Sequence, residues 1–230
     1  MRGLFVTGTD TEAGKSVLAA SICAALAARG ERVAAFKPAL TGLDASPGEW
    51  PRDHELLASA ASAGQSANDV APYRFGPPLS PHLAAELAGE PIEPRRLMEA
   101  AEAAAKGAEW LICEGVGGLL VPLTPGYLVR DLAIDLAMPL VVAARTGLGT
   151  INHTLLTIGS ARAAGVTVAG VAMTPWPEHP ARIELSNRET VERLGGVAVA
   201  GLGHTSPDSL AEAGSLLPLD QWLRHNQPHA

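Results

Sequence analysis

A glycine-bounded stretch near the start of the chain constrains the fold more than any other feature of the sequence. The apolar run at 4–6 is typical of a buried strand, and the Ala- and Leu-rich run at 17–29 is typical of a helix. Between them stands Gly8-Thr9-Asp10-Thr11-Glu12-Ala13-Gly14-Lys15-Ser16. A strand, a glycine-bounded loop, Gly-Lys-Ser and a helix in this order predict a phosphate-binding loop, or P-loop.

Each residue type in this loop has a chemical reason. Backbone N–H groups of the loop and of the first helical turn point into one concavity, where the helix dipole favours an anion. Gly8 and Gly14 let the backbone approach closely, Lys15 can reach the β- and γ-phosphates, and the Ser16 hydroxyl can ligate Mg²⁺. The spacer Thr9 to Ala13 is one residue longer than in the standard motif, so the alternative is a solvated turn. The flanking strand and helix favour nucleotide binding.

Composition excludes several classes of function. A hydrophobic fraction of 47% supports a sizeable core, and a formal net charge of -7 provides no basic surface for nucleic acid. No apolar run approaches the length of a membrane span, and the start of the chain lacks the regions of a signal peptide, so we expect a cytoplasmic protein. Cys23 and Cys113 fall in expected core elements and are interpreted as buried thiols.

Apolar runs alternate with helical stretches along the whole chain. Strands are expected at 3–7, 32–37, 109–114, 139–144, 167–172 and 197–202. Helices are expected at 15–29, 52–62, 80–89, 94–106, 150–164, 181–194 and 208–224, and loops at 46–51, 76–78 and 174–177. This alternation predicts a single P-loop NTPase-like α/β domain over 1–224, with a doubly wound, mostly parallel sheet. We expect 225–230 to be a disordered tail.

Lysine is rare in this chain, which draws attention to Lys37. Lys15, Lys37 and Lys106 are the only lysines, because arginine supplies the other basic residues. The second expected strand ends at Lys37, beside the P-loop in a parallel sheet, so its ammonium would face the phosphates. The alternative is a surface lysine whose stem packs on apolar neighbours.

Two carboxylates are candidates for the same edge of the sheet. Glu114 follows an apolar strand, and a buried carboxylate needs a partner such as Mg²⁺ held by Ser16. The alternative is a loop carboxylate that reaches solvent beside the glycines that follow. Asp53 is interpreted as a favourable charge in the first turn of a helix, with a role at the site left open. Residues 147–153 open another helix and offer a second anion site, with Thr150 as its cap.

Together these stretches resemble the dethiobiotin synthetase family. The matching pieces are Gly8 to Ser16, Lys37-Pro38 with Thr41-Gly42, Ser80-Pro81-His82, Glu114-Gly115-Val116-Gly117-Gly118, and Leu148-Gly149-Thr150-Ile151-Asn152-His153. The P-loop of that family has the same extra residue. The resemblance implies an ATP- and Mg²⁺-dependent ligase that closes the ureido ring of dethiobiotin from 7,8-diaminononanoate (7,8-diaminopelargonate) and CO₂. It also implies small-molecule substrates, a homodimer with shared active sites, and no nucleic-acid or membrane partner.

The resemblance assigns roles by position. Catalysis falls to Thr11, Lys15 and Lys37, and Mg²⁺ to Ser16, Asp53 and Glu114. Nucleotide contacts fall to Gly8, Thr9, Asp10, Thr11, Glu12, Ala13, Gly14, Lys15, Ser16, Val17, Glu114 and Thr174. Substrate contacts fall to Thr41, Ser80, Pro81, Gly149, Thr150, Ile151 and Asn152. The last four would bind the carboxylate of a substrate molecule that is held in the active site of the partner subunit.

The chain departs from the family at one place. An Asn-Asp pair after the late strand meets adenine in the family, whereas this chain has Ala172-Met173-Thr174-Pro175-Trp176. The departure implies that the backbone reads the base or that other nucleoside triphosphates replace ATP.

Other nucleotide-binding classes remain as alternatives. Partner-regulated P-loop ATPases of the partition or septum-placement type share the expected sheet. They carry an additional lysine early in the loop, and residues 7–14 contain none. An amidotransferase-type synthase of cobalamin synthesis would bring a glutaminase domain, for which we expect no room after the core.

Overall fold

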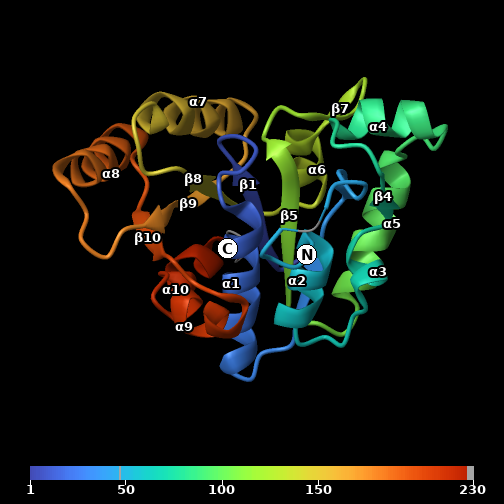
Figure 1. Ribbon diagram of the computed structural model, residues 1–230, viewed down its shortest axis with the longest axis horizontal. Coiled ribbons are helices and arrows are strands. Elements are labelled where there is room, and N and C mark those ends of the chain that lie inside the picture. The colour runs from blue at the N-terminus through green and yellow to red at the C-terminus, as the bar shows by residue number, and fades with distance from the viewer. Residues whose placement is uncertain (47, 227–230) are drawn as a thin grey trace.

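The computed structural model describes residues 1–46 and 48–226, and a six-stranded parallel sheet forms its centre (Figure 1). The strand order is β10-β9-β8-β1-β5-β2. These strands are β1 (Gly3–Gly8), β2 (Val33–Phe36), β5 (Trp110–Gly118), β8 (Leu140–Ala144), β9 (Val168–Trp176) and β10 (Val199–Gly203). All six were expected from apolar runs, and the single α/β domain with a parallel sheet confirms the predicted fold class.

Helices cover both faces of this sheet, and short strands and turns connect them. The helices are α1 (Lys15–Ala28), α2 (Asp53–Ala60), α3 (Ala67–Val70), α4 (Pro81–Ala88), α5 (Pro94–Ala105), α6 (Val129–Asp135), α7 (Thr150–Ala163), α8 (Arg182–Gly195), α9 (Leu210–Ser215) and α10 (Leu219–Leu223). The short elements are β3 (Ala39–Leu40), β4 (Tyr73–Arg74), β6 (Pro122–Thr124), β7 (Tyr127–Leu128) and the 3₁₀ turns Pro207–Ser209 and Arg224–Asn226.

Two hydrophobic cores lie on the two faces, because strand side chains alternate between them. On β1, Leu4 and Val6 pack in the core with α1, α2, α9 and α10, whereas Phe5 packs in the core with α5, α6, α7 and α8. On β5, Ile112 packs in the same core as Leu4 and Val6, and Cys113 packs in the same core as Phe5. Both faces of the central strands are therefore buried, which explains why these strands read as continuous apolar runs.

The carboxyl ends of the central strands meet at one edge, which positions the P-loop. Gly8 ends β1, and α1 begins at Lys15, after a cap at Gly14 whose φ is 83°. A side chain would rarely adopt this left-handed backbone, so glycine is favoured there. The register pairs Phe36 of β2 with Cys113 of β5, and so brings Lys37 next to Glu114.

Three sequence expectations need correction. The predicted helix at 208–224 is broken into a 3₁₀ turn, α9 and α10, because Pro218 cannot continue a helix. Residues 174–176 belong to β9 and not to a loop, and β5 continues through 115–118 instead of ending at Glu114. Both segments continue as strands through their Pro or Gly residues because they pair with neighbouring strands.

Three further expectations concern the cysteines, membrane-spanning helices and the end of the chain. Cys23 and Cys113 are free and buried, as predicted. No helix within 1–46 and 48–226 is long and apolar enough to cross a membrane. Of the predicted tail 225–230, His225 and Asn226 complete the last 3₁₀ turn, and 227–230 lie outside the described residues.

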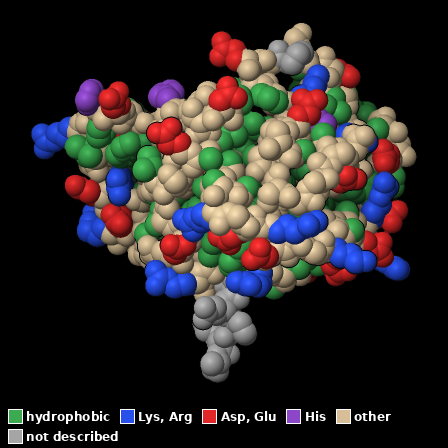
Figure 2. Space-filling view, turned by 90° about the horizontal axis from the view of Figure 1, so that it is seen from below, with side chains coloured by type: hydrophobic (Ala, Val, Ile, Leu, Met, Phe, Trp, Pro, Cys, Tyr) green, Lys and Arg blue, Asp and Glu red, His purple; other side chains and the backbone are tan. Residues whose placement is uncertain are grey.

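Charges of both signs are interspersed on the face drawn in Figure 2. Neither the acidic nor the basic side chains gather there into one continuous patch.

We predict that Gly214→Ala lowers the free energy of unfolding by about 1–3 kcal/mol. Helix α9 packs so closely on α1 that a methyl group at Gly214 would clash with the backbone carbonyl of Ser21. The matched control is Gly159→Ala in α7, where a methyl group meets no atom within 4 Å. Urea unfolding should show the control unchanged or stabilised by up to about 1 kcal/mol. Equal effects of the two substitutions would contradict the close packing of α9 on α1.

Candidate active site

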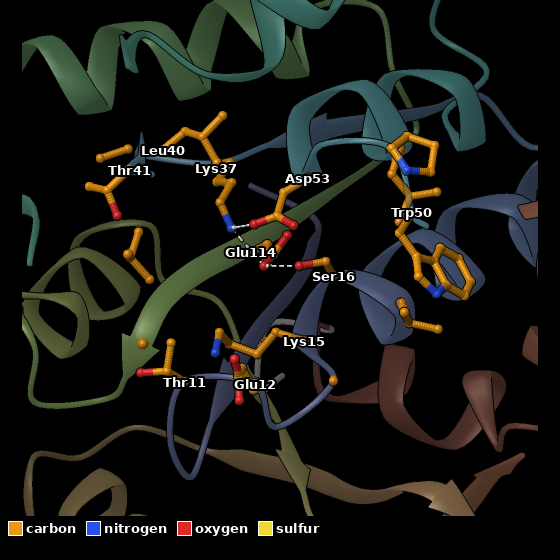
Figure 3. A pocket seen from close by; sticks show the side chains of 17 residues that line it. Thr11, Glu12, Lys15, Ser16, Lys37, Leu40, Thr41, Trp50, Asp53 and Glu114 are labelled. Atoms are coloured by element: carbon orange, nitrogen blue, oxygen red, sulfur yellow. Dashed lines mark hydrogen bonds and ion pairs between the residues drawn. The ribbon is translucent and has the colours of Figure 1, made fainter. Parts of the chain in front are cut away.

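A cavity of about 400 Å³ opens at the carboxyl edge of the sheet, between the P-loop, the end of β2 and the start of α2 (Figure 3). From the P-loop it is lined by Thr11, Glu12, Gly14, Lys15, Ser16 and Val17. From the rest of the chain it is lined by Lys37, Thr41, Trp50, Asp53 and Glu114, among others. Residues that lie far apart in the sequence therefore face one space, as expected at the carboxyl ends of parallel strands.

The P-loop is held by contacts of its own backbone. The Lys15 ammonium donates to the carbonyl of Asp10 at 2.9 Å, and the Asp10 carboxylate accepts from the backbone N–H of Thr11 at 2.7 Å. Thr174 is buried and packs against Gly14 so closely that a side chain at Gly14 would clash with its methyl group. Thr174 therefore lies directly beside the loop, as its assignment to the nucleotide site requires.

Lys37 lies between two carboxylates. Its ammonium is 2.9 Å from Asp53 Oδ2 and 2.7 Å from Glu114 Oε1. The Ser16 hydroxyl donates to the same Glu114 Oε1 at 2.8 Å. Lys37 and Glu114 are buried, whereas the Asp53 side chain is 38% exposed and faces the cavity. The structure thus places Lys37 at the predicted edge, but as the centre of an ion-paired cluster.

Burial and neighbouring charges shift the pKa values of these groups in different directions. Burial lowers the pKa of Lys15, and the Glu114 carboxylate acts against it. Burial also acts to lower the pKa of Lys37, but Glu114 and then Asp53 outweigh it, so this pKa is raised. Burial raises the pKa of Glu114, and the Lys37 ammonium opposes it. Lys37 therefore stays an ammonium group in the cavity wall.

The oxygen atoms around this cluster fit a hard divalent cation. Glu114 Oε2 is buried and has no hydrogen-bond partner among the described residues. Asp53 and Ser16 add one carboxylate and one hydroxyl. No group of three or more His, Cys, Asp or Glu side chains suited to a metal occurs within 1–46 and 48–226. Two carboxylates beside a phosphate-binding loop suit Mg²⁺, which usually takes one or two carboxylates together with substrate phosphates.

The predicted substrate residues divide into two groups. Thr41 lines the cavity, whereas Ser80, Pro81 and 149–152 do not. Ser80 and Pro81 form the start of α4, and 149–152 lie at the start of α7. The described residues of one chain therefore do not bring the whole predicted substrate site together.

A second hollow, of about 440 Å³, lies between the P-loop and α7. Thr9 and Asp10 line it from the loop, and His153 and Leu156 line it from α7. Three leucines around this region are strongly exposed: Leu148 at 95%, Leu156 at 64% and Leu120 at 53%. Contiguous exposed apolar side chains are typical of interaction sites in general.

Several cavity residues escaped the sequence analysis. Trp50 and Pro51 belong to a segment that was expected only to be a loop. Val116 and Gly117 lie in the extension of β5. For Trp50 and Pro51 the one available signal was position, because they lie just before Asp53 in the sequence.

Solved structures share this fold. A ParA family ATPase from Chlorobium tepidum TLS matches with a TM-score of 0.53 and 12% identity, over 98% of this chain and 97% of that chain. A chain of the MinC:MinD cell division protein complex of Aquifex aeolicus matches with a TM-score of 0.55 and 12% identity, over 98% and 94%. At this identity the likeness concerns the fold alone, which is that of P-loop ATPases.

Sequence relatives narrow the class to a family. A family described as an AAA domain matches residues 2–207. The ATP-dependent dethiobiotin synthetase BioD of Bacillus cereus (strain B4264) is 40% identical over 202 residues, which are 88% of this chain and 83% of that protein. The protein of the same name from Anaeromyxobacter dehalogenans (strain 2CP-1 / ATCC BAA-258) is 41% identical over 217 residues, or 94% and 96%. The chain therefore belongs to the dethiobiotin synthetase family, which confirms the resemblance drawn from its motifs.

Proposed function

We propose that this chain is an ATP-dependent dethiobiotin synthetase that forms the ureido ring from 7,8-diaminononanoate and CO₂. The observation that carries the proposal is one cavity faced by both Lys15 of the P-loop and Lys37 of the ion-paired cluster. Both ammonium groups belong to motifs of the family to which the chain belongs. Their positions suit a reaction in which anionic groups are joined and transferred.

The proposed reaction has three steps. One amine of the diamine attacks CO₂, loses a proton to water and becomes a carbamate. A carbamate oxygen attacks the γ-phosphorus of ATP, and the bond to ADP breaks. The second amine attacks the carbonyl carbon of the resulting carbamic-phosphoric anhydride, phosphate leaves, and the ring closes as the amine loses its proton to water.

The roles of the side chains follow from charge. Lys15 neutralises the phosphates from the loop, and Lys37 neutralises the carbamate and the transferred phosphoryl group from the end of β2. Positioned cations supply most of the stabilisation in such an anionic transition state. Ser16, Asp53 and Glu114 would hold Mg²⁺, which supplies further positive charge to the phosphate oxygens. Thr11 and Thr41 line the reacting groups.

A homodimer completes the proposed site. The α7 start, with Gly149, Thr150, Ile151 and Asn152, lies outside the cavity of its own chain, and Leu148 beside it is almost fully exposed. A helix N-terminus of this kind suits a carboxylate. We therefore assign the α7 start to the distant carboxylate of a diamine bound in the partner's cavity. Free buried thiols fit a reducing cytoplasm, where we place the enzyme.

The test of this function is phosphate release from ATP with and without diaminononanoate and bicarbonate. We expect release to require the diamine, Lys15→Ala to abolish turnover, and Lys37→Ala to spare nucleotide binding but lose ring closure. Removal of either positioned charge should raise the barrier by about 3 kcal/mol or more. Calorimetry with ATP separates the nucleotide-binding defect from the chemical defect.

The matched control is Lys106→Ala, which removes the remaining lysine from an exposed position. It should leave turnover unchanged. Normal ring closure by Lys37→Ala would refute the role of that residue. Phosphate release that ignores the diamine would instead favour a simple ATPase of the partition or septum-placement type, whose fold this chain shares.

A separate prediction concerns the nucleotide base. Met173 and Thr174 are buried where an Asn that contacts the base is expected in the family, and neither side chain contains an amide. We expect GTP or CTP to replace ATP within roughly tenfold, or about 1.4 kcal/mol. Competition between the nucleotides at equal Mg²⁺ measures this preference. Discrimination above about a thousandfold, roughly 4 kcal/mol, would mean that another element reads adenine.

A further prediction tests the shared site by mixing two inactive variants. Lys15→Ala spoils the phosphate side, and Asn152→Asp places a repelling charge at the carboxylate side. In a mixed dimer both lesions fall in one composite site and the other site is intact. Equal mixing with subunit exchange should restore about a quarter of the wild-type sites.

The control mixes Lys15→Ala with the double variant Lys15→Ala/Asn152→Asp. Every site in that mixture lacks the P-loop lysine, so no activity should return. If exchange is demonstrated and the first mixture also stays inactive, both groups serve one chain and the shared site is wrong.

A further inference from the structure

Arg52, immediately before α2, binds three backbone carbonyls of one segment, 42–45, whose residues are half-buried or exposed. Its guanidinium donates to Gly42 at 3.4 Å, to Leu43 at 2.8 Å and to Ala45 at 3.2 Å. The backbone of Arg52 is itself tied to the first turn of α2, because its N–H donates to Glu55 Oε2 at 3.1 Å. One half-buried side chain thus joins the start of α2 to the segment 42–45.

The segment 42–45 continues from one wall of the active-site cavity. It follows directly after Thr41, which lines the cavity opposite Asp53. On its other side, the N–H groups of Gly42, Leu43 and Asp44 donate to carbonyls of 75–77. The segment is therefore fixed between the chain that leads to α4 on one side and Arg52 on the other.

Packing alone does not join this segment to α2. A hollow of about 290 Å³ lies between them, lined by Thr41, Gly42 and Ala45 on one side and by Trp50, Arg52 and Asp53 on the other. The guanidinium reaches from the α2 side of this hollow to the carbonyls. Exposed segments with few apolar contacts open locally at little cost, so their position depends on such individual bonds.

We infer that Arg52 is a positioning residue for the diamine substrate: by holding 42–45 against α2, it sets Thr41 at a fixed distance from the Lys37, Asp53 and Glu114 cluster. The inference rests on the proposed function, in which Thr41 contacts the diamine. Arg52 itself touches neither reacting group. It acts through the backbone of the segment, and the shape of its planar donor fork matters more than its charge.

A positioning role predicts different behaviour for arginine and lysine at position 52. Several N–H donors in a rigid fork can serve carbonyls that point from successive turns of a loop, whereas one ammonium on a flexible stem is a point charge. A purely electrostatic role would be preserved by Arg52→Lys. A positioning role would be lost in both Arg52→Lys and Arg52→Gln.

The test compares Arg52→Lys and Arg52→Gln with Arg32→Gln as matched control. Arg32 also donates to a backbone carbonyl, that of Ala63, but lies before β2 at the opposite edge of the sheet. We expect both Arg52 variants to raise the KM for diaminononanoate about tenfold, with kcat and the KM for ATP within about twofold of wild type. The control should match wild type in all three constants.

Hydrogen exchange supplies an independent measurement of the same variants. The amides of 42–45 should exchange faster in both Arg52 variants, and those of the core strands should not. A normal diamine KM in Arg52→Lys, equal losses for ATP and the diamine, or unchanged exchange in 42–45 would each overturn the inference. Diamine-independent phosphate release by the wild type would refute the proposed function instead, while the exchange data still decide whether Arg52 fixes the segment.

Discussion

The buried pair of Lys37 and Glu114 is the interaction on which the rest of the site depends. A fully buried carboxylate is costly unless a cation and hydrogen bonds compensate it. Here the cation is Lys37 at the end of β2, and the hydrogen bond comes from the Ser16 hydroxyl of α1. Lys37 also pairs with a second carboxylate, that of Asp53 in α2. Four segments, with Glu114 of β5 as the fourth, are thereby joined at one edge of the sheet, and each contributes a polar group to the same cavity.

The sheet explains why this pair forms at that place. Strands β2 and β5 are neighbours, and their register sets Phe36 opposite Cys113, so the next residues of both strands lie side by side. The carboxyl ends of parallel strands also receive the P-loop, because it follows β1 directly. One topological arrangement thus brings a phosphate-binding loop, a buried ammonium group and two carboxylates to a common space.

Fold and family contribute different information about this protein. Partition and septum-placement ATPases share the sheet with a TM-score near 0.5, yet their sequences are only 10–12% identical to this chain. The relatives near 40% identity are dethiobiotin synthetases. A shared fold accommodates different chemistry when its loops carry different groups.

The sequence by itself determined the six central strands, the P-loop and the family. These features are local: apolar runs, a glycine-bounded loop and short motifs express themselves within a few residues. The pairing of Lys37 with Glu114 was not available from such signals, because it depends on strand order and register.

Only the tertiary structure decided how far β5 and β9 extend and that Arg52 holds the segment 42–45. Strand pairing carried β5 and β9 through glycine and proline residues that had indicated loops. Arg52 resembles any surface arginine until the fold brings three carbonyls within reach of its guanidinium. The physical reason is common to both: contacts between segments far apart in the chain overrode local preference.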